Sequence, residues 1–441
     1  MNRKQRRLEK KLGSPVVQGP RPAFQGLFAD AVHHHQAGRL SEAERCCRQV
    51  LAADPRHADS LHLLGIVAYQ TGHHDPALDL IRTAIKTNGR VASYHSSLGI
   101  VLAEQGLLDQ AVASYRKALV LNPNYPEAHN NLGIALGKQG RLDQAVACYQ
   151  RALALRPDYP EAHNNLGATL RDQGRLDQAV ACFQSALALR PDYPEALNNL
   201  GAAFRDQGRL DEAVASARRA IAIRPHYPEA HNDLGKALRD QERLEEAVAC
   251  YRRALDLRPG YPEANNNLGT ALKDQGRLEE AVACYRSALD RKPDYPEAHN
   301  NLGVALAKLG LLDEALACYR RALDHKPNLL EAQNNLGTAL RDQERLDEAV
   351  TCFRRVLDLK PDYPEAHNNL GATLRDQGRL DGPSPASARP STAGRTTRRH
   401  TTTWVQRSGA RNGWTRPSPA SGRHSTASRI TRRHITTSAM R

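Results

Sequence analysis

Large apolar side chains are scarce in this 441-residue sequence, which contains only 5 Phe, 2 Met and 2 Trp. So small a supply argues against one large globular core, because such cores are filled mainly by bulky apolar residues. No run of about 18 apolar residues occurs, so no membrane-spanning helix is expected. The 8 cysteines are too few for a disulfide scaffold.

Acidic residues are missing from residues 382–441, which contain 12 Arg. The first twelve residues hold six Lys or Arg and one Glu, so the two ends account for more than the whole net charge of +14. Residues 13–381 are therefore near neutral, at about −3. A nucleic-acid-binding domain usually carries its basic patch on the folded part, so nucleic acid is not expected as a partner.

Catalytic motifs are also missing. The sequence has no Gly-rich phosphate-binding loop, no nucleophile elbow and no His-Glu-x-x-His zinc motif. It therefore predicts that this chain is not an enzyme and holds no cofactor.

What the sequence does contain is a repeat of 34 residues. The block PEAHNNLG begins at Pro126, Pro160, Pro296 and Pro364, and close variants stand at the intervening steps. Ten units fill residues 24–363, and an eleventh, truncated unit covers residues 364–381. Such a period is typical of solenoids, in which each unit buries its apolar face only against its neighbours.

Each unit is predicted to form two helices. In one unit, residues 127–139 carry apolar side chains at helical spacing and are closed by Gly140. A second helix is expected to start at Asp143, as its N-cap, and to end before Pro157. Gly133 is expected where the two helices approach closely, and Tyr149 supplies bulk between units.

These residues resemble the tetratricopeptide repeat family. The match rests on Leu132-Gly133, Ala145, Tyr149, Ala152 and Pro157, repeated along about 80% of the chain. The resemblance implies an all-α fold: a right-handed superhelical solenoid of 34-residue helix-turn-helix repeats, with a concave groove that binds peptide segments.

In the eight units that begin at residue 126 and beyond, the first helix carries one polar residue at a constant position, and we expect this row to bind peptides. Side-chain amides can pair with the N–H and C=O groups of an extended peptide whatever its sequence. The alternative is that Asn recurs only because the units are recent copies. The row consists of Asn131, Asn165, Asn199, Asp233, Asn267, Asn301, Asn335 and Asn369.

The row is similar to one in the repeat region of O-GlcNAc transferases, and the segments Met1–Arg7 and His57–Gly65 resemble the front of bacterial proteins with such repeats. This resemblance gives an alternative function, the substrate-recognition part of a protein O-GlcNAc-transferase-like glycosyltransferase. The catalytic domain of such an enzyme has no counterpart in the chain.

Two further rows have simpler interpretations. Seven of the eight cysteines recur at one repeat position, with Cys47 next to it, and units about 10 Å apart exceed the reach of about 7 Å for a disulfide. They are therefore expected to be reduced, which favours a cytoplasmic protein. Arg-Asp pairs such as Arg171-Asp172 and Arg205-Asp206 are interpreted as ion pairs at the rim, with partner choice as the alternative.

The two ends are expected to be flexible. Residues 1–23 are basic, and residues 382–441 are rich in Arg, Ser, Thr and Pro, a composition typical of disorder. The C-terminal segment nevertheless repeats at 34 residues, as Pro383-Ser-Pro-Ala-Ser matches Pro417-Ser-Pro-Ala-Ser. Codons chosen for Arg395–Trp404 also spell PDYPEAHNNL when they are read one base out of phase. We therefore predict an out-of-frame translation of further repeats.

The sequence thus favours a cytoplasmic scaffold that binds extended peptide segments of other proteins in a tetratricopeptide groove. Neither a membrane nor nucleic acid is an expected partner.

Overall fold

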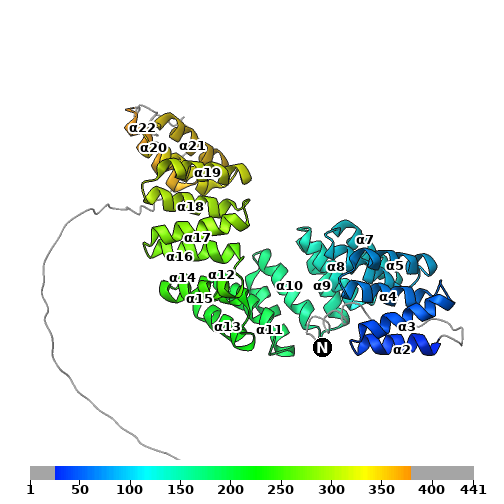
Figure 1. Cartoon of the computed structure of the whole chain (residues 1–441). Helices are drawn as coiled ribbons and strands as arrows, with labels where there is room; N and C mark the ends of the chain where they lie inside the picture. Colours follow the sequence, from blue (N-terminus) through cyan, green and yellow to red (C-terminus); the bar gives the residue numbers. More distant parts are fainter. Residues whose placement is uncertain (1–24, 379–441) are drawn as a thin grey trace, which may run out of the picture. The chain divides into compact units, whose positions relative to one another are not determined.

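The computed structural model describes residues 25–378, and every regular element in this range is an α-helix (Figure 1). The helices pair into hairpins. The first helices are α2 (Gln25–Gln36), α4 (Ala58–Gln70), α6 (Ala92–Glu104), α8 (Pro126–Lys138), α10 (Pro160–Asp172), α12 (Pro194–Asp206), α14 (Pro228–Asp240), α16 (Pro262–Asp274), α18 (Pro296–Lys308), α20 (Leu330–Asp342) and α22 (Pro364–Asp376).

The second helices follow after short turns. They are α3 (Leu40–Ala53), α5 (His74–Thr87), α7 (Leu108–Leu121), α9 (Leu142–Leu155), α11 (Leu176–Leu189), α13 (Leu210–Ile223), α15 (Leu244–Leu257), α17 (Leu278–Arg291), α19 (Leu312–His325) and α21 (Leu346–Leu359). The predicted all-α solenoid of helix-turn-helix repeats is confirmed. The predicted flexible segments 1–23 and 382–441 lie outside the described residues. Within residues 25–378, no helix is long and apolar enough to cross a bilayer.

The ends of the helices follow from local chemistry. Helix α8 begins with Pro126 at its first turn, where the missing N–H costs nothing, and Glu127 places a negative charge beside the helix N-terminus. Gln139 ends the helix, and Gly140 follows in the left-handed region at φ 73°. The chain then turns directly into α9.

The prediction that Asp143 caps α9 is wrong. Arg141 occupies the N-cap position and makes no side-chain capping hydrogen bond. Asp143 lies in the first turn instead, and its Oδ1 accepts a hydrogen bond from Gln173 Nε2 of the next hairpin at 2.9 Å. Its carboxylate therefore links two repeats, which the sequence of a single unit does not reveal.

Two turns contain Glu where the others contain Gly. Glu242 and Glu344 adopt φ values of 63° and 58°, a region that disfavours side chains with a Cβ atom. We expect Glu242→Gly to raise the free energy of unfolding by about 1 kcal/mol, because the left-handed conformation costs other residues about that much. Urea denaturation measures the change.

Glu245→Gly is the matched control for this turn. Glu245 lies three residues away in the first turn of α15, where glycine is expected to cost about 1 kcal/mol. Equal effects of the two substitutions would contradict the strain at Glu242.

The close approach of the two helices in a hairpin depends on a glycine and an aromatic ring. A Cβ atom on Gly133 would lie 2.7 Å from Tyr149 Cε1, and one on Gly167 would lie 2.8 Å from Phe183 Cε1. Both distances are shorter than van der Waals contact. The predicted close packing at Gly133 is therefore confirmed, and its cause is the ring on the second helix.

The hairpins stack around one continuous core, which runs from Ile66 to Phe353. Each second helix packs on the first helix of its own hairpin and on that of the next. Successive first helices also contact one another, as α10 contacts both α8 and α12. The first helices thus form one side of the stack, along which neighbouring hairpins also meet, and this side is called the inner side below.

The N-terminal hairpins contain a buried histidine that makes their stability depend on pH. His62 is fully buried, Ser97 Oγ lies 2.9 Å from its Nε2, and burial lowers its pKa from 6.5 to about 3. The unfolded chain therefore binds the proton first, and stability is lost as the pH falls below 6.5. Between pH 6.5 and 5, this residue is expected to cost about 2 kcal/mol.

Urea denaturation at both pH values measures this effect. His62→Gln should flatten the dependence, because it removes the titrating group. His73→Gln, at an exposed position, should leave the dependence as it is in the unmodified chain. If the free energy of unfolding changed equally with pH in all three proteins, the effect could not be assigned to His62.

Candidate peptide-binding face

The inner side of the stack carries two columns of asparagine. The second column is the predicted row, and the first column comes one residue earlier in each repeat. In most repeats, the second-column residue donates its Nδ2–H to the first-column Oδ1 of the preceding repeat. These rungs join Asn165 to Asn130, Asn199 to Asn164, Asn267 to Asn232, Asn301 to Asn266, Asn335 to Asn300 and Asn369 to Asn334, with distances of 2.9 to 3.1 Å.

The rungs give the predicted row a structural role that its repetition alone does not show. Its members are half-buried, except for Asn131, which is only 4% exposed. An amide has two N–H donors and an acceptor oxygen, so a rung uses only part of the capacity of each second-column side chain. The set of rungs, called the ladder below, therefore fixes the orientation of the second-column amides. It leaves some of their N–H and C=O groups available for a ligand.

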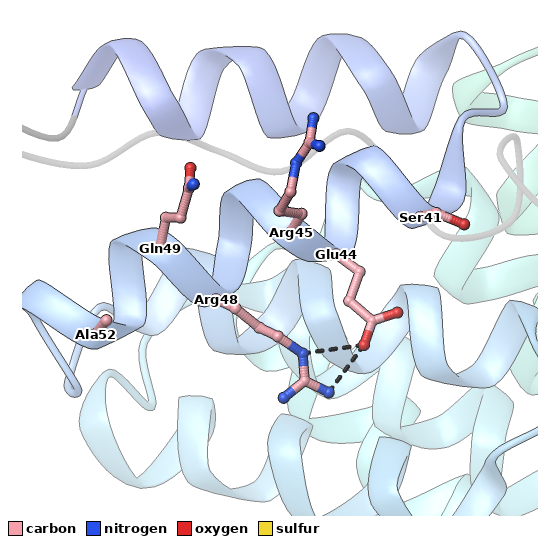
Figure 2. Close-up of a pocket in the computed structure, with 6 residues that line it drawn as sticks. All are labelled: Ser41, Glu44, Arg45, Arg48, Gln49 and Ala52. Atoms are coloured by element: carbon pink, nitrogen blue, oxygen red, sulfur yellow. Dashed lines mark hydrogen bonds and ion pairs between the residues drawn. The ribbon is translucent and has the colours of Figure 1, made fainter.

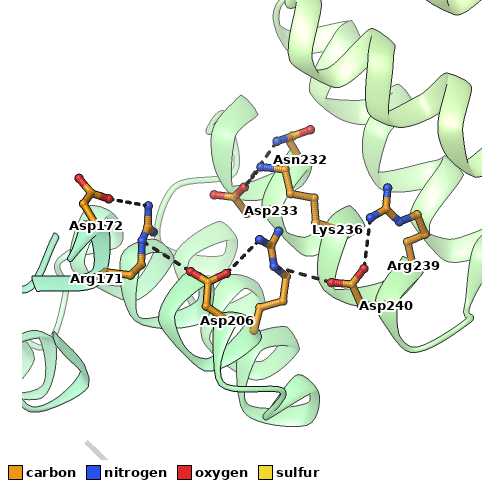
Figure 3. Close-up of polar contacts among 9 residues, drawn as sticks. Arg171, Asp172, Asp206, Asn232, Asp233, Lys236, Arg239 and Asp240 are labelled. Atoms are coloured by element: carbon orange, nitrogen blue, oxygen red, sulfur yellow. Dashed lines mark hydrogen bonds and ion pairs between the residues drawn. The ribbon is translucent and has the colours of Figure 1, made fainter. Parts of the chain in front are cut away.

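Two positions depart from the pattern. Asn131 makes no rung, because the preceding repeat has the shorter Ser96 at the first-column position, and its Nδ2 has no partner among the described residues. Asp233 reverses its rung, because a carboxylate only accepts, and Asn198 Nδ2 donates to it at 2.7 Å. Figure 3 shows its other partner, Lys236, whose Nζ lies 2.8 Å from Asp233 Oδ1. In α14 the ladder therefore contains an ion pair, formed by Asp233 and Lys236.

A hollow of about 400 Å³ lies on this face across consecutive repeats. Its amide side consists of Asn130, Asn164, Asn165 and Asn199, and three tyrosine rings and Ile134 provide apolar surface. The tyrosines are Tyr159, Tyr193 and Tyr227, and Glu161 and Glu195 also line the hollow. Tyr159 and Tyr193 are buried, so the amides and the half-buried Tyr227 offer most of the polar and aromatic surface to a ligand.

Cations hold these tyrosines in place. The Arg190 guanidinium lies 4.8 Å from the centre of the Tyr193 ring, and its Nη2 is 2.7 Å from Glu161 Oε1. Arg224 repeats the arrangement with Tyr227, at 4.9 Å, and with Glu195. Burial raises the pKa of Tyr227 above its usual value, so this phenol stays protonated.

The Arg-Asp pairs form a second, charged row at the ends of the first helices (Figure 3). Arg171 Nε lies 3.7 Å from Asp206 Oδ2, and Arg205 Nε lies 3.7 Å from Asp240 Oδ2 in the following repeat. These side chains are about one-third exposed, and such pairs contribute less than about 1 kcal/mol each. The predicted ion pairing is confirmed, and a role in partner choice stays a prediction.

Other clusters offer less chemistry. A hollow of about 380 Å³ is lined by side chains of α3 alone, among which Glu44 and Arg48 pair at 2.8 Å (Figure 2). Among the described residues, no group of three or more His, Cys, Asp or Glu could hold a metal ion. The cysteines are free thiols, and burial raises the pKa of Cys250 to about 11.

Comparison with known families agrees with the geometry. A family model described as "TPR repeat" matches residues 99–140, 138–170, 235–276, 269–310 and 337–378. Two models described as "Tetratricopeptide repeat" match residues 158–226 and 296–329, so these models together span more than half of the chain. The chain belongs to the tetratricopeptide repeat family. A model of anaphase-promoting complex, cyclosome, subunit 3 also matches residues 36–118.

Solved structures of tetratricopeptide proteins are similar over part of the chain. A thermophilic TPR protein from Thermus thermophilus is 28% identical, with a TM-score of 0.38, over 41% of this chain and 99% of its own. YrrB, a TPR protein with an unusual peptide-binding site, is 23% identical, with a TM-score of 0.33, over 42% of this chain and 95% of its own.

A third similar structure is the APC/C hetero-tetramer Cut9-Hcn1. It is 14% identical, with a TM-score of 0.46, over 80% of this chain and 97% of the other. No curated protein sequence matches the chain.

Proposed function

We propose that the inner face of the ten repeats in residues 24–363 binds extended peptide segments of other proteins. The observation that carries the proposal is the hollow, because it brings Asn165 and Asn199 of the predicted row together with the tyrosines in one surface. The rungs orient the amides before a ligand arrives, which lowers the entropy lost on binding.

The spacing of the ladder suits an extended chain. Stacked helices lie about 10 Å apart, and an extended peptide advances about 3.3 Å per residue, so one rung corresponds to roughly three peptide residues. A peptide of about twelve residues would therefore span the hollow. Backbone pairing with amides favours broad recognition, and the tyrosine rings add preference for apolar side chains.

A library of random peptides about twelve residues long, displayed on phage, tests the proposal. Peptides selected on the full chain are expected to bind Ile134→Arg at least tenfold more weakly, because a long side chain there occupies the hollow without touching a rung. Gln150→Arg makes the same charge change at an exposed position of α9 and should bind normally. Equal binding to both variants would reject this face as the site.

The second proposed function uses the same face to recognise substrates of an O-GlcNAc-transferase-like glycosyltransferase. Asn165 and Asn199, which motivate it, lie in the hollow described above. The coding sequence beyond residue 441 tests it: a glycosyltransferase domain in one reading frame with the repeats would favour this role. If no such domain is found, the scaffold function is the proposal that remains.

A further inference from the structure

The inner side presents the same chemical groups once in each repeat of the ladder. The rungs from Asn165 to Asn130 and from Asn199 to Asn164 are each 3.0 Å long and join residues 35 positions apart. Packed helices lie about 8–10 Å apart, and α10 contacts both α8 and α12. A ligand that pairs with several rungs in the same way must therefore repeat its own groups at about this distance.

Among the regular conformations of a peptide, polyproline II matches this step. A β-strand turns the same side to a surface every two residues, at about 6.7 Å and then at about 13 Å. An α-helix uses its backbone groups internally, so they cannot pair with the amides. Polyproline II has three residues per turn and rises about 3.1 Å per residue, so the same side recurs about every 9.3 Å. One turn of such a peptide therefore corresponds to one repeat.

The amides of the second column suit the backbone of a polyproline II peptide. This conformation has no internal hydrogen bonds, so each backbone C=O is free to accept one. Asn165 and Asn199 each use one Nδ2–H in a rung, and both side chains line the hollow. An amide nitrogen carries two N–H groups, so the second one can donate to a peptide C=O once per turn.

Small side chains beside these amides leave room for a ring. Ala168 and Ala202 lie one helical turn after the second-column amides of α10 and α12, and both are half-buried. The equivalent residue of α8 is Ile134, which lines the hollow together with the half-buried Tyr227. The wall beside the amides is therefore apolar, and apolar grooves with aromatic residues are the surfaces on which proline-rich segments bind.

The charged groups of the hollow already have partners. Its two carboxylates belong to Glu161 and Glu195, which lie 2.7 and 3.0 Å from the Nη2 atoms of Arg190 and Arg224, respectively. Because each carboxylate is neutralised by a guanidinium, a charged peptide gains little attraction there. The hollow therefore favours a neutral segment.

We propose that the hollow binds a neutral, proline-rich segment of another protein in the polyproline II conformation, with proline at every third position. The prolines face the wall formed by Ile134, Ala168 and Ala202, and backbone C=O groups between them accept hydrogen bonds from the amides. Proline fixes φ at about −65°, so the segment has this conformation before it binds and loses less entropy. The inference rests on the proposed peptide binding and specifies its ligand.

Labelled peptides of twelve residues test the proposal on the full chain by fluorescence anisotropy. The probe is Pro-Ser-Ala repeated four times, and saturable binding is expected. A peptide of the same composition with its prolines at positions 1, 3, 7 and 9 should bind at least fivefold more weakly, because these prolines do not all face one side. Val-Ser-Ala repeated four times should lose a similar factor, because valine does not fix the conformation.

Ala168→Lys should weaken binding of the probe at least fivefold, because the long side chain occupies the room beside the amides. The fold accepts lysine here, since Lys236 stands at the same position in α14. Ala181→Lys makes the same change at an exposed position of α11 and should bind the probe normally. Absence of saturable binding, equal binding of all three peptides, or equal binding of the probe to both variants would overturn the proposal.

The peptides selected from the random library separate this inference from the proposed function. Proline at three-residue spacing is expected to be enriched among those that bind Ile134→Arg more weakly. If these peptides show no such spacing, the inner side binds peptides and the polyproline II ligand is rejected. If no selected peptide loses affinity for Ile134→Arg, both proposals fail.

Discussion

Phe183→Ala is expected to lower the free energy of unfolding by about 3–5 kcal/mol, the usual cost of removing a fully buried aromatic ring. The Phe183 side chain is completely buried on α11, and its ring contacts the Gly167 position of α10. No bulky side chain from a neighbouring turn can replace it, because the backbones of the two helices are already close. Urea denaturation followed by circular dichroism measures the loss.

Cys182→Ala on the same helix is the control for Phe183→Ala. Cys182 is half-buried, and its substitution removes one atom at the edge of the core, so a loss below about 1 kcal/mol is expected. Hydrogen exchange should place the damage from Phe183→Ala in the hairpin α10–α11 and its neighbours, since repeats interact mainly with those next to them. A uniform acceleration along the whole stack would contradict this local coupling.

Gly269→Ala is expected to destabilise the protein by about 1–3 kcal/mol, although alanine normally favours a helix. The new Cβ atom would lie 2.8 Å from Tyr285 Cε1, and that ring is completely buried and cannot swing away. Thermal or urea denaturation of the single variant gives the cost.

Gly371→Ala occupies the same repeat position in α22, where nothing described lies within 4 Å. Here the helix propensity acts alone, so a gain of up to about 1 kcal/mol is expected. The two substitutions should therefore have opposite signs. If Gly371→Ala destabilised the chain as much as Gly269→Ala, the aromatic ring would not be the cause.

Much of the fold follows from the sequence because the repeat makes each element visible many times. The 34-residue period, the helix-closing Gly140 and the small Gly133 all indicate helical hairpins, and the helices lie within one residue of the predicted starts at Glu127 and Asp143. The role of Asp143 was mispredicted because its partner, Gln173, belongs to the next unit. Contacts between units depend on how the hairpins stack, which a single unit does not encode.

The candidate site was predicted in part. The hollow includes Asn165 and Asn199 of the predicted row, but Asn131 is buried and Asp233 is paired with Lys236. The rungs were not foreseen, because they join residues 35 positions apart across two repeats. The tyrosines of the hollow were also missed. They recur before each PEA block, and this regular column of aromatic residues was the available indication in the sequence.

The central claim is that the inner face of the repeats binds extended peptides. Hydrogen exchange of the full chain with and without a selected peptide tests it most directly, because it reports each helix separately. Slower exchange is expected in the first helices α8, α10, α12 and α14, which line the hollow or stand beside it. Protection confined to the second helices α9, α11 and α13 would contradict the claim.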